Sequence, residues 1–156
     1  YFAMKGEQER GKKYIGNSAP RVDAELNIGI YKAFSKAVEE GLVASAISVH
    51  RGGLGTALAK SAIAGQLGID VELEKITGDC TRMDYTLYSE SQGRLVVTIN
   101  PENQENFEGV IGQKMFAMIG RVRGDKQFRI TREGKNVVDT TIDEITKSYK
   151  STFRGY

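Results

Sequence analysis

Cysteine and histidine are nearly absent from this sequence: each occurs once, as Cys80 and His50, and tryptophan does not occur at all. A single cysteine excludes an internal disulfide framework and fits a reducing compartment, so we expect a cytoplasmic protein. One cysteine and one histidine also exclude a zinc site built from these ligands, and we expect no metal site in this chain.

Long apolar runs and a strong excess of one charge are missing as well. No stretch reaches the roughly 18 apolar residues that a membrane span needs, and residues 1–21 are too polar for a signal peptide. The net charge of +2 is too small to indicate a nucleic-acid or membrane partner by itself. With 156 residues, 40% of them hydrophobic, the chain has the size and composition of one globular domain.

The chain begins with Tyr1 instead of methionine, so we expect a fragment or a processed product. Residues 1–22 carry scattered charges and two breakers, Gly16 and Pro20. We therefore expect residues 1–22 to be an arm or linker from an upstream domain, and residues 23–156 to be a single domain.

The hydrophobic periodicity predicts the order helix, strand, helix, strands, helix, two strands, helix. Helices are expected over 23–40 and 54–67, after Asn100-Pro101, and from Thr141, where Thr141 and Glu144 form a capping-box pattern. Strands are expected over 44–49, 70–74, 83–88, 94–99, 116–122 and 127–131. The last two would form a hairpin across Gly124-Asp125. Sequential hairpins favour a mainly antiparallel sheet of four or more strands, in a layered α/β/α domain of the α+β class.

The most informative stretch is Ile47 to Leu58, where a β-branched run meets a glycine cluster (Gly52, Gly53, Gly55) and a helix follows at once. Glycines let backbone N–H groups come close to a ligand, and a helix N-terminus adds unpaired N–H groups and a positive dipole end. This pattern is typical of a phosphate site. The alternative is a tight turn whose packing needs small residues. Neither the dinucleotide fingerprint nor the P-loop fits, because Leu58 replaces the last glycine of the first and Ala59 the last glycine of the second.

Three further groups of polar residues have two interpretations each. His50 and Arg51 can give charge-assisted hydrogen bonds to a phosphate, or they are solvated loop residues. The turn from Ser89 to Arg94 can face a ligand, but polar turns usually face only water. The basic segment 121–135 can contact a nucleic-acid backbone, although a solvated strand face is the better interpretation because only Phe128 is aromatic in it.

Two of these segments together resemble a known family. The run Glu39-Glu40-Gly41-Leu42-Val43-Ala44-Ser45-Ala46-Ile47-Ser48-Val49-His50-Arg51-Gly52-Gly53-Leu54, with Ala57-Leu58-Ala59 and Ala64-Gly65 after it, is similar to the C-terminal domain of phosphoribosylformylglycinamidine synthase (FGAM synthase), synthetase subunit. The run Tyr88-Ser89-Glu90-Ser91-Gln92-Gly93-Arg94-Leu95-Val96-Val97 resembles a second signature of that domain. Ile119-Gly120-Arg121-Val122 follows in the expected order, so the resemblance spans nearly the whole chain.

The resemblance implies an ATP- and magnesium-dependent ligase of purine biosynthesis. The family activates the formyl amide oxygen of formylglycinamide ribonucleotide with ATP, and ammonia from a glutaminase subunit then displaces phosphate. Most ATP contacts and the catalytic histidine belong to an N-terminal domain, so we expect no catalytic residue and no tightly bound cofactor in this chain, which should be inactive alone. The resemblance implies substrate or phosphate contacts at Gly52, Gly53 and Leu54, with Ser89, Glu90, Ser91 and Arg94 facing the same cleft. The chemistry of their side chains adds His50 and Arg51 to the expected site. The resemblance also implies that a β-branched residue at Gly52 or Gly53 abolishes catalysis without unfolding the domain.

One departure from the family concerns charge. The family loop usually reads Asp-x-Ser-acid-Gly-Gly-Leu, whereas Ser48, His50 and Arg51 stand at the corresponding places here. Two acids are lost and a cation is gained, which disfavours a metal and favours a phosphate. The alternatives are a sister enzyme of the superfamily, of the aminoimidazole ribonucleotide synthase or selenophosphate synthetase type, and a free-standing phosphate- or nucleic-acid-binding domain.

Overall fold

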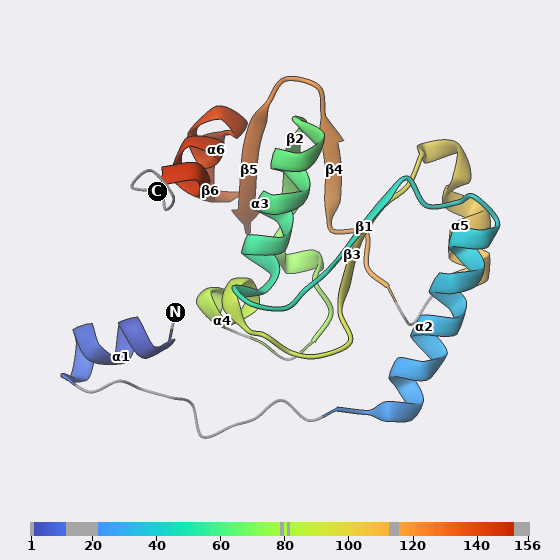
Figure 1. Ribbon diagram of the computed structural model, residues 1–156, viewed down its shortest axis with the longest axis horizontal. Coiled ribbons are helices and arrows are strands. Elements are labelled where there is room, and N and C mark those ends of the chain that lie inside the picture. Colours follow the sequence, from blue (N-terminus) through green and yellow to red (C-terminus); the bar gives the residue numbers. More distant parts are fainter. Residues whose placement is uncertain (1, 12–21, 79, 81, 113–115, 152–156) are drawn as a thin grey trace.

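The computed structural model describes residues 2–11, 22–78, 80, 82–112 and 116–151. Helices and strands are interspersed along the chain, and the last three strands follow one another (Figure 1). The helices are α1 (Phe2–Arg10), α2 (Ala24–Glu39), α3 (Gly53–Gly65), α4 (Met83–Tyr88), α5 (Gln104–Ile111) and α6 (Ile142–Ser151), with the 3₁₀ turns η1 (Leu73–Lys75) and η2 (Pro101–Asn103). The strands are β1 (Ser45–Ser48), β2 (Gly68–Glu72), β3 (Leu95–Thr98), β4 (Gly120–Arg123), β5 (Gln127–Arg132) and β6 (Lys135–Thr141).

The main sheet has four strands in the order β4-β2-β5-β6. The β4–β2 and β5–β6 pairs are antiparallel, and the central β2–β5 pair is parallel. The α+β class is confirmed, and so are the expected helices at 23–40 and 54–67. The expected hairpin between β4 and β5 is wrong, because β2 lies between these strands.

A close backbone approach explains how the connection from β4 to β5 passes the end of β2. A Cβ atom placed on Gly68 would lie 2.4 Å from the carbonyl oxygen of Gln127 and 2.7 Å from its nitrogen. Only glycine leaves room for this contact. The hairpin on this side of the sheet instead joins β5 to β6 through Glu133 and Gly134, whose φ angles of 50° and 73° suit a tight turn.

The segment Met83–Tyr88 is helix α4, so the strand predicted there is wrong. Its N-terminus is fixed locally: Arg82 forms an ion pair with Asp84, and the Thr86 hydroxyl donates to the Arg82 carbonyl. Thr86 and Leu87 are buried, and α4 packs against α3. Residues 1–22, expected to be an arm, contain helix α1.

Two apolar clusters form the core. The larger one lies between the main sheet and helices α3, α4 and α6, and its most buried members are Ile130 and Ile142. The smaller one, built on Ala37, Leu42, Phe107 and Ile111, joins α2 to α5. The two-stranded sheet β1–β3 lies between them in Figure 1. Consecutive side chains of β3 pack against different clusters: Val96 packs against the larger cluster and Val97 against the smaller one.

The last helix begins as the sequence predicts. The Thr141 hydroxyl accepts a hydrogen bond from the Glu144 N–H at 3.3 Å, and the Glu144 carboxylate accepts one from the Thr141 N–H at 3.1 Å. This reciprocal pair is the capping box. Within this helix Ile142 is buried and Ile145 is partly buried, whereas Tyr149 is exposed.

Candidate anion-binding site at the glycine loop

The glycine loop connects β1 to α3 and turns sharply at Gly52. Gly52 has φ 86° and ψ 0°, the left-handed region that side chains disfavour, and Gly53 begins the helix with its N–H donating to the His50 carbonyl at 2.9 Å. As the N-cap residue, Gly52 has no side chain to cap the helix. The first-turn N–H groups of α3 therefore need acceptors from elsewhere.

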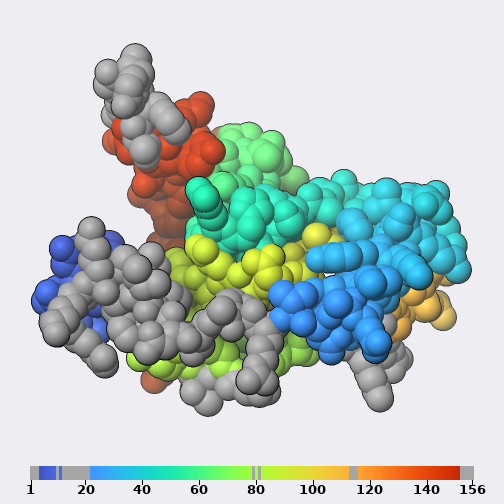
Figure 2. All heavy atoms as spheres, turned by 60° about the horizontal axis from the view of Figure 1, so that its bottom comes forward, coloured from blue at the N-terminus to red at the C-terminus, as the bar shows by residue number. Residues whose placement is uncertain are grey.

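The turn from Ser89 to Arg94 supplies such an acceptor, so the two segments singled out in the sequence meet. The Glu90 carboxylate accepts a hydrogen bond from the Gly52 N–H at 2.8 Å. The Val49 N–H donates to the Arg94 carbonyl at 2.9 Å, at the ends of β1 and β3. Figure 2 shows the two segments side by side on one face, with α2 beside them in blue. A carboxylate of the protein itself thus accepts from the loop N–H that a bound anion would use.

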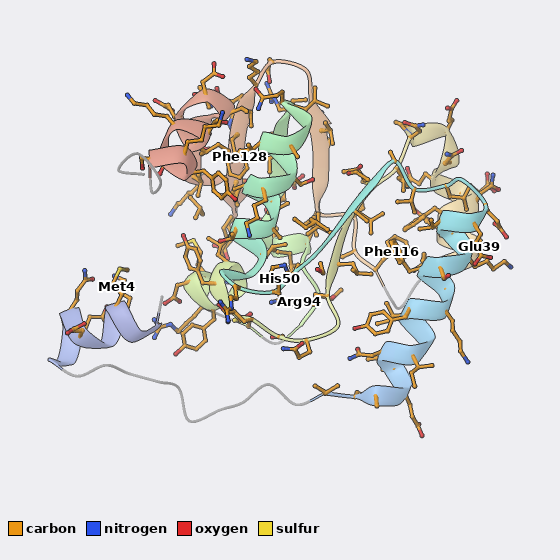
Figure 3. All side chains as sticks on the ribbon, viewed as in Figure 1. Met4, Glu39, His50, Arg94, Phe116 and Phe128 are labelled. Atoms are coloured by element: carbon orange, nitrogen blue, oxygen red, sulfur yellow. The ribbon has the colours of Figure 1, made fainter. Side chains whose placement is uncertain are left out.

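Arg94 lies partly buried under this turn. Its Nη2 donates to the carbonyl oxygen of Ser89 at 2.5 Å and to the Ser89 hydroxyl at 3.2 Å, while its Nε is buried with no hydrogen-bond partner among the described residues. Burial lowers the pKa of the guanidinium, which nevertheless stays charged at neutral pH. Figure 3 shows Arg94 near His50. Arg94 thus holds the turn and leaves part of its positive charge uncompensated.

The exposed lip of the loop carries cations. His50 and Arg51 are exposed, and together with Lys60 and Thr56 of α3 they line a depression of about 10 Å³, the size of one water molecule. The sequence analysis did not predict Lys60 and Thr56 as site residues. Their spacing of four residues on a helix that starts at the loop places them on one face of that helix, and this signal could have found them.

Two of the predicted site residues have packing roles as well. Leu54 is 5% exposed and belongs to the larger cluster, so its side chain is not available to a ligand. A Cβ atom on Gly53 would lie 2.6 Å from the Leu87 carbonyl oxygen and 2.7 Å from the Tyr88 Cα. The packing of α4 against α3 therefore requires glycine at position 53, which supports the interpretation of the loop as a close-packed turn for that residue.

Donors and cations dominate the site, and this suits binding of an anion more than coordination of a metal. In the part of the chain that the structure describes, no three His, Cys, Asp or Glu side chains gather where they could hold a metal ion. Within the same residues, no helix is both long and apolar enough to cross a membrane.

Comparison with known proteins identifies the domain. The family model described as "AIR synthase related protein, C-terminal domain" matches residues 1–133. The chain belongs to this family. Its relatives include the phosphoribosylformylglycinamidine synthase subunit PurL of Methanocaldococcus jannaschii, 34% identical over 153 residues, which are 98% of this chain and 20% of that protein. The PurL subunit of Thermococcus gammatolerans is 38% identical over 109 residues, 70% of this chain and 15% of that protein.

Solved structures have the same fold. PurL of Thermotoga maritima in complex with FGAR matches with a TM-score of 0.76 and 24% identity, over 86% of this chain and 23% of that one. The hydrogenase maturation protein HypE matches with a TM-score of 0.64 and 18% identity, over 86% of this chain and 47% of that one. This chain spans about one fifth of the length of the curated PurL relatives. The names of these relatives confirm the resemblance to FGAM synthase.

Proposed function

We propose that this chain is the C-terminal domain of an FGAM synthase and forms one wall of its substrate cleft. The whole enzyme would convert formylglycinamide ribonucleotide, ATP and ammonia from glutamine into formylglycinamidine ribonucleotide, ADP and phosphate. The observation that carries the proposal is the meeting of the glycine loop with the Ser89–Arg94 turn in a chain similar to PurL subunits. Similarity to PurL of T. maritima, solved with FGAR, supports the substrate class.

The residues of the loop offer a binding place for a phosphate group of the ligand. The N–H of Gly52, the dipole of α3 and the side chains of His50 and Arg51 all favour negative charge. The same N–H now donates to Glu90, so an incoming phosphate would displace this carboxylate, and Ser89, Ser91 and Arg94 would line the other side. Loss of the hydrogen bond between Gly52 and Glu90 costs free energy, and attraction between the phosphate and the basic side chains on the lip offsets this cost.

ATP and magnesium belong to the proposed reaction, but this chain does not fit a magnesium site. Magnesium prefers carboxylate oxygens, whereas the loop carries Ser48 and Arg51 where the family has acids, and the described residues hold no cluster of metal ligands. We therefore assign no step at this loop to the metal. Solved PurL chains in complex with ATP, AMPPCP and ADP support nucleotide use by the whole enzyme.

The partners would be the N-terminal domain of the same enzyme and a glutaminase subunit. A solved T. maritima assembly named PurLQS, with a TM-score of 0.69 to this chain, supports such an association. The compartment would be the cytoplasm, in keeping with the free thiol of Cys80. Nucleic-acid binding is less favoured, because Arg121 and Arg123 of the basic segment form ion pairs with Asp70.

The decisive test is ADP release by the full-length protein given ATP, magnesium, formylglycinamide ribonucleotide and ammonium. We expect release that depends on the ribonucleotide. Arg51→Met should raise the KM for the ribonucleotide about tenfold, the size of one charge-assisted hydrogen bond, while Arg121→Met, also an exposed arginine, should leave KM unchanged. No release with intact ribonucleotide would contradict the proposal and favour a sister enzyme or a binding domain.

A further inference from the structure

We propose that a second ligand site lies between α3 and α6, for a compact planar molecule with an apolar body and one anionic group. A groove of about 320 Å³ runs there over the main sheet. Pockets for small ligands start at about this volume and are mostly apolar, with few polar groups. The groove goes beyond the proposed reaction: it extends from α3 to α6, and it shares only Thr56 and Lys60 with the depression at the glycine loop.

The floor of the groove is apolar and rigid. Leu87, Phe128 and Ile130 form it, and each is at most 3% exposed. The walls carry two aromatic rings, Tyr88 from α4 and Tyr149 from α6, and Tyr149 is 52% exposed. Aromatic side chains favour a flat ring as a neighbour, either stacked or edge to face. Shape and surface therefore select a flat apolar body over a ribonucleotide, which is rich in hydroxyl groups.

The charge of the groove favours an anionic ligand. Among the described residues that line it, Lys60 is the only charged one, and no acidic side chain accompanies it. Lys60 forms no ion pair with another described residue. A half-buried ammonium beside an apolar floor favours an anionic group on the ligand. Thr56 and Ser148 add hydroxyl groups near the same rim.

The test uses two dyes that differ only by one sulfonate group, with the intact protein that contains this chain. 1-Anilinonaphthalene-8-sulfonate carries a sulfonate, and N-phenyl-1-naphthylamine is its neutral counterpart; both fluoresce more strongly in apolar sites. We expect both to bind. Lys60→Met should weaken the sulfonate about tenfold and leave the neutral dye within about twofold. Lys147→Met on α6, outside the groove lining, is the matched control and should change neither.

A filling variant locates the binding. Ser148 is exposed at the rim, so Ser148→Trp should fold and should block both dyes. The proposal would be overturned if neither dye binds, or if Ser148→Trp leaves dye binding unchanged. It would also be overturned if the groove is covered in a dimer and opens only when the dimer dissociates. If Ser148→Trp fails to fold, the ratio of the two dye affinities in Lys60→Met still decides. ADP release by Ser148→Trp reports the proposed function separately from dye binding, because Ser148 lines the groove and not the depression at the glycine loop.

Discussion

At Gly53 the backbone of α3 touches the backbone of α4. The φ angle is +68°, and a Cβ atom would lie 2.6 Å from the Leu87 carbonyl oxygen. A backbone atom cannot rotate away as a side chain can, so a substitution must move one element. The expectation that the domain stays folded with a bulky residue at this position therefore needs correction, because stability and catalysis would be lost together.

We predict that Gly53→Ala lowers the free energy of unfolding by roughly 2–4 kcal/mol, from the cost of a side chain in the left-handed region and of overpacking. Gly109→Ala is the matched control, since Gly109 lies within α5 with nothing within 4 Å of a built Cβ. It should stabilise the protein by about 0.5–1 kcal/mol, because glycine is costly in a helix. Urea unfolding of both variants measures the difference, and equal effects would contradict the packing argument.

The residues of the site were predictable to different degrees. His50, Arg51 and Gly52 stand in a pattern that any reader of the sequence can find, and the structure places them on the lip of the loop. The contact between Gly52 and Glu90 joins residues 38 apart, and no local pattern reveals such a pair. The contact at Leu54 stays a prediction for its backbone N–H alone, because its side chain is buried in the larger cluster.

At the scale of elements, the errors have a common physical cause. In α4, Met83, Tyr85 and Leu87 alternate with polar residues, which is the pattern of a strand, and packing against α3 overrides it. The order β4-β2-β5 depends on pairs such as Asp70 with Arg121 and Arg129, which are more than 50 residues apart. Local signals such as caps and glycine stops were therefore reliable, and strand neighbours were not.

The capping box of α6 gives a pH-dependent prediction. Hydrogen bonds from the Thr140 hydroxyl and the Thr141 N–H lower the pKa of Glu144 from its usual 4.5. A depressed folded-state pKa adds stability above the unfolded-state pKa, and this contribution is lost as the pH falls through the folded-state pKa. Glu144→Gln should thus lower the melting temperature at pH 7, with the difference from the unmodified protein shrinking below pH 4.5.

The control for this prediction is a second variant at the hydrogen-bond donor. Thr140→Val keeps the shape of the side chain but removes the hydroxyl that donates to Glu144. In this background the effect of Glu144→Gln should depend less on pH. Melting curves of the four proteins between pH 3 and 7 measure the coupling, and a pH dependence that Thr140→Val leaves intact would argue against this pair.

At the scale of the whole molecule, the described residues form two apolar clusters of unequal size joined by the β1–β3 pair. The smaller cluster joins α2 to α5, and α2 also flanks the candidate site: a Cβ on Gly93 would lie 2.4 Å from the side-chain oxygen of Asn27. Opening of the smaller cluster would therefore release one side of the Ser89–Arg94 turn. Stability of this cluster and order at the site should change together.

We predict that Phe107→Ala acts locally. It removes a side chain of the smaller cluster that is only 7% exposed. Loss of a buried phenylalanine costs about 3–5 kcal/mol, and native-state hydrogen exchange shows where this cost falls. Amides of α2 and α5 should lose protection while those of β5 keep theirs. Ile130→Ala, in the larger cluster, should lower the protection of both regions, because α2 and α5 depend on the main sheet for support through β3. An equal loss across all elements in Phe107→Ala would mean that the two clusters unfold as one unit.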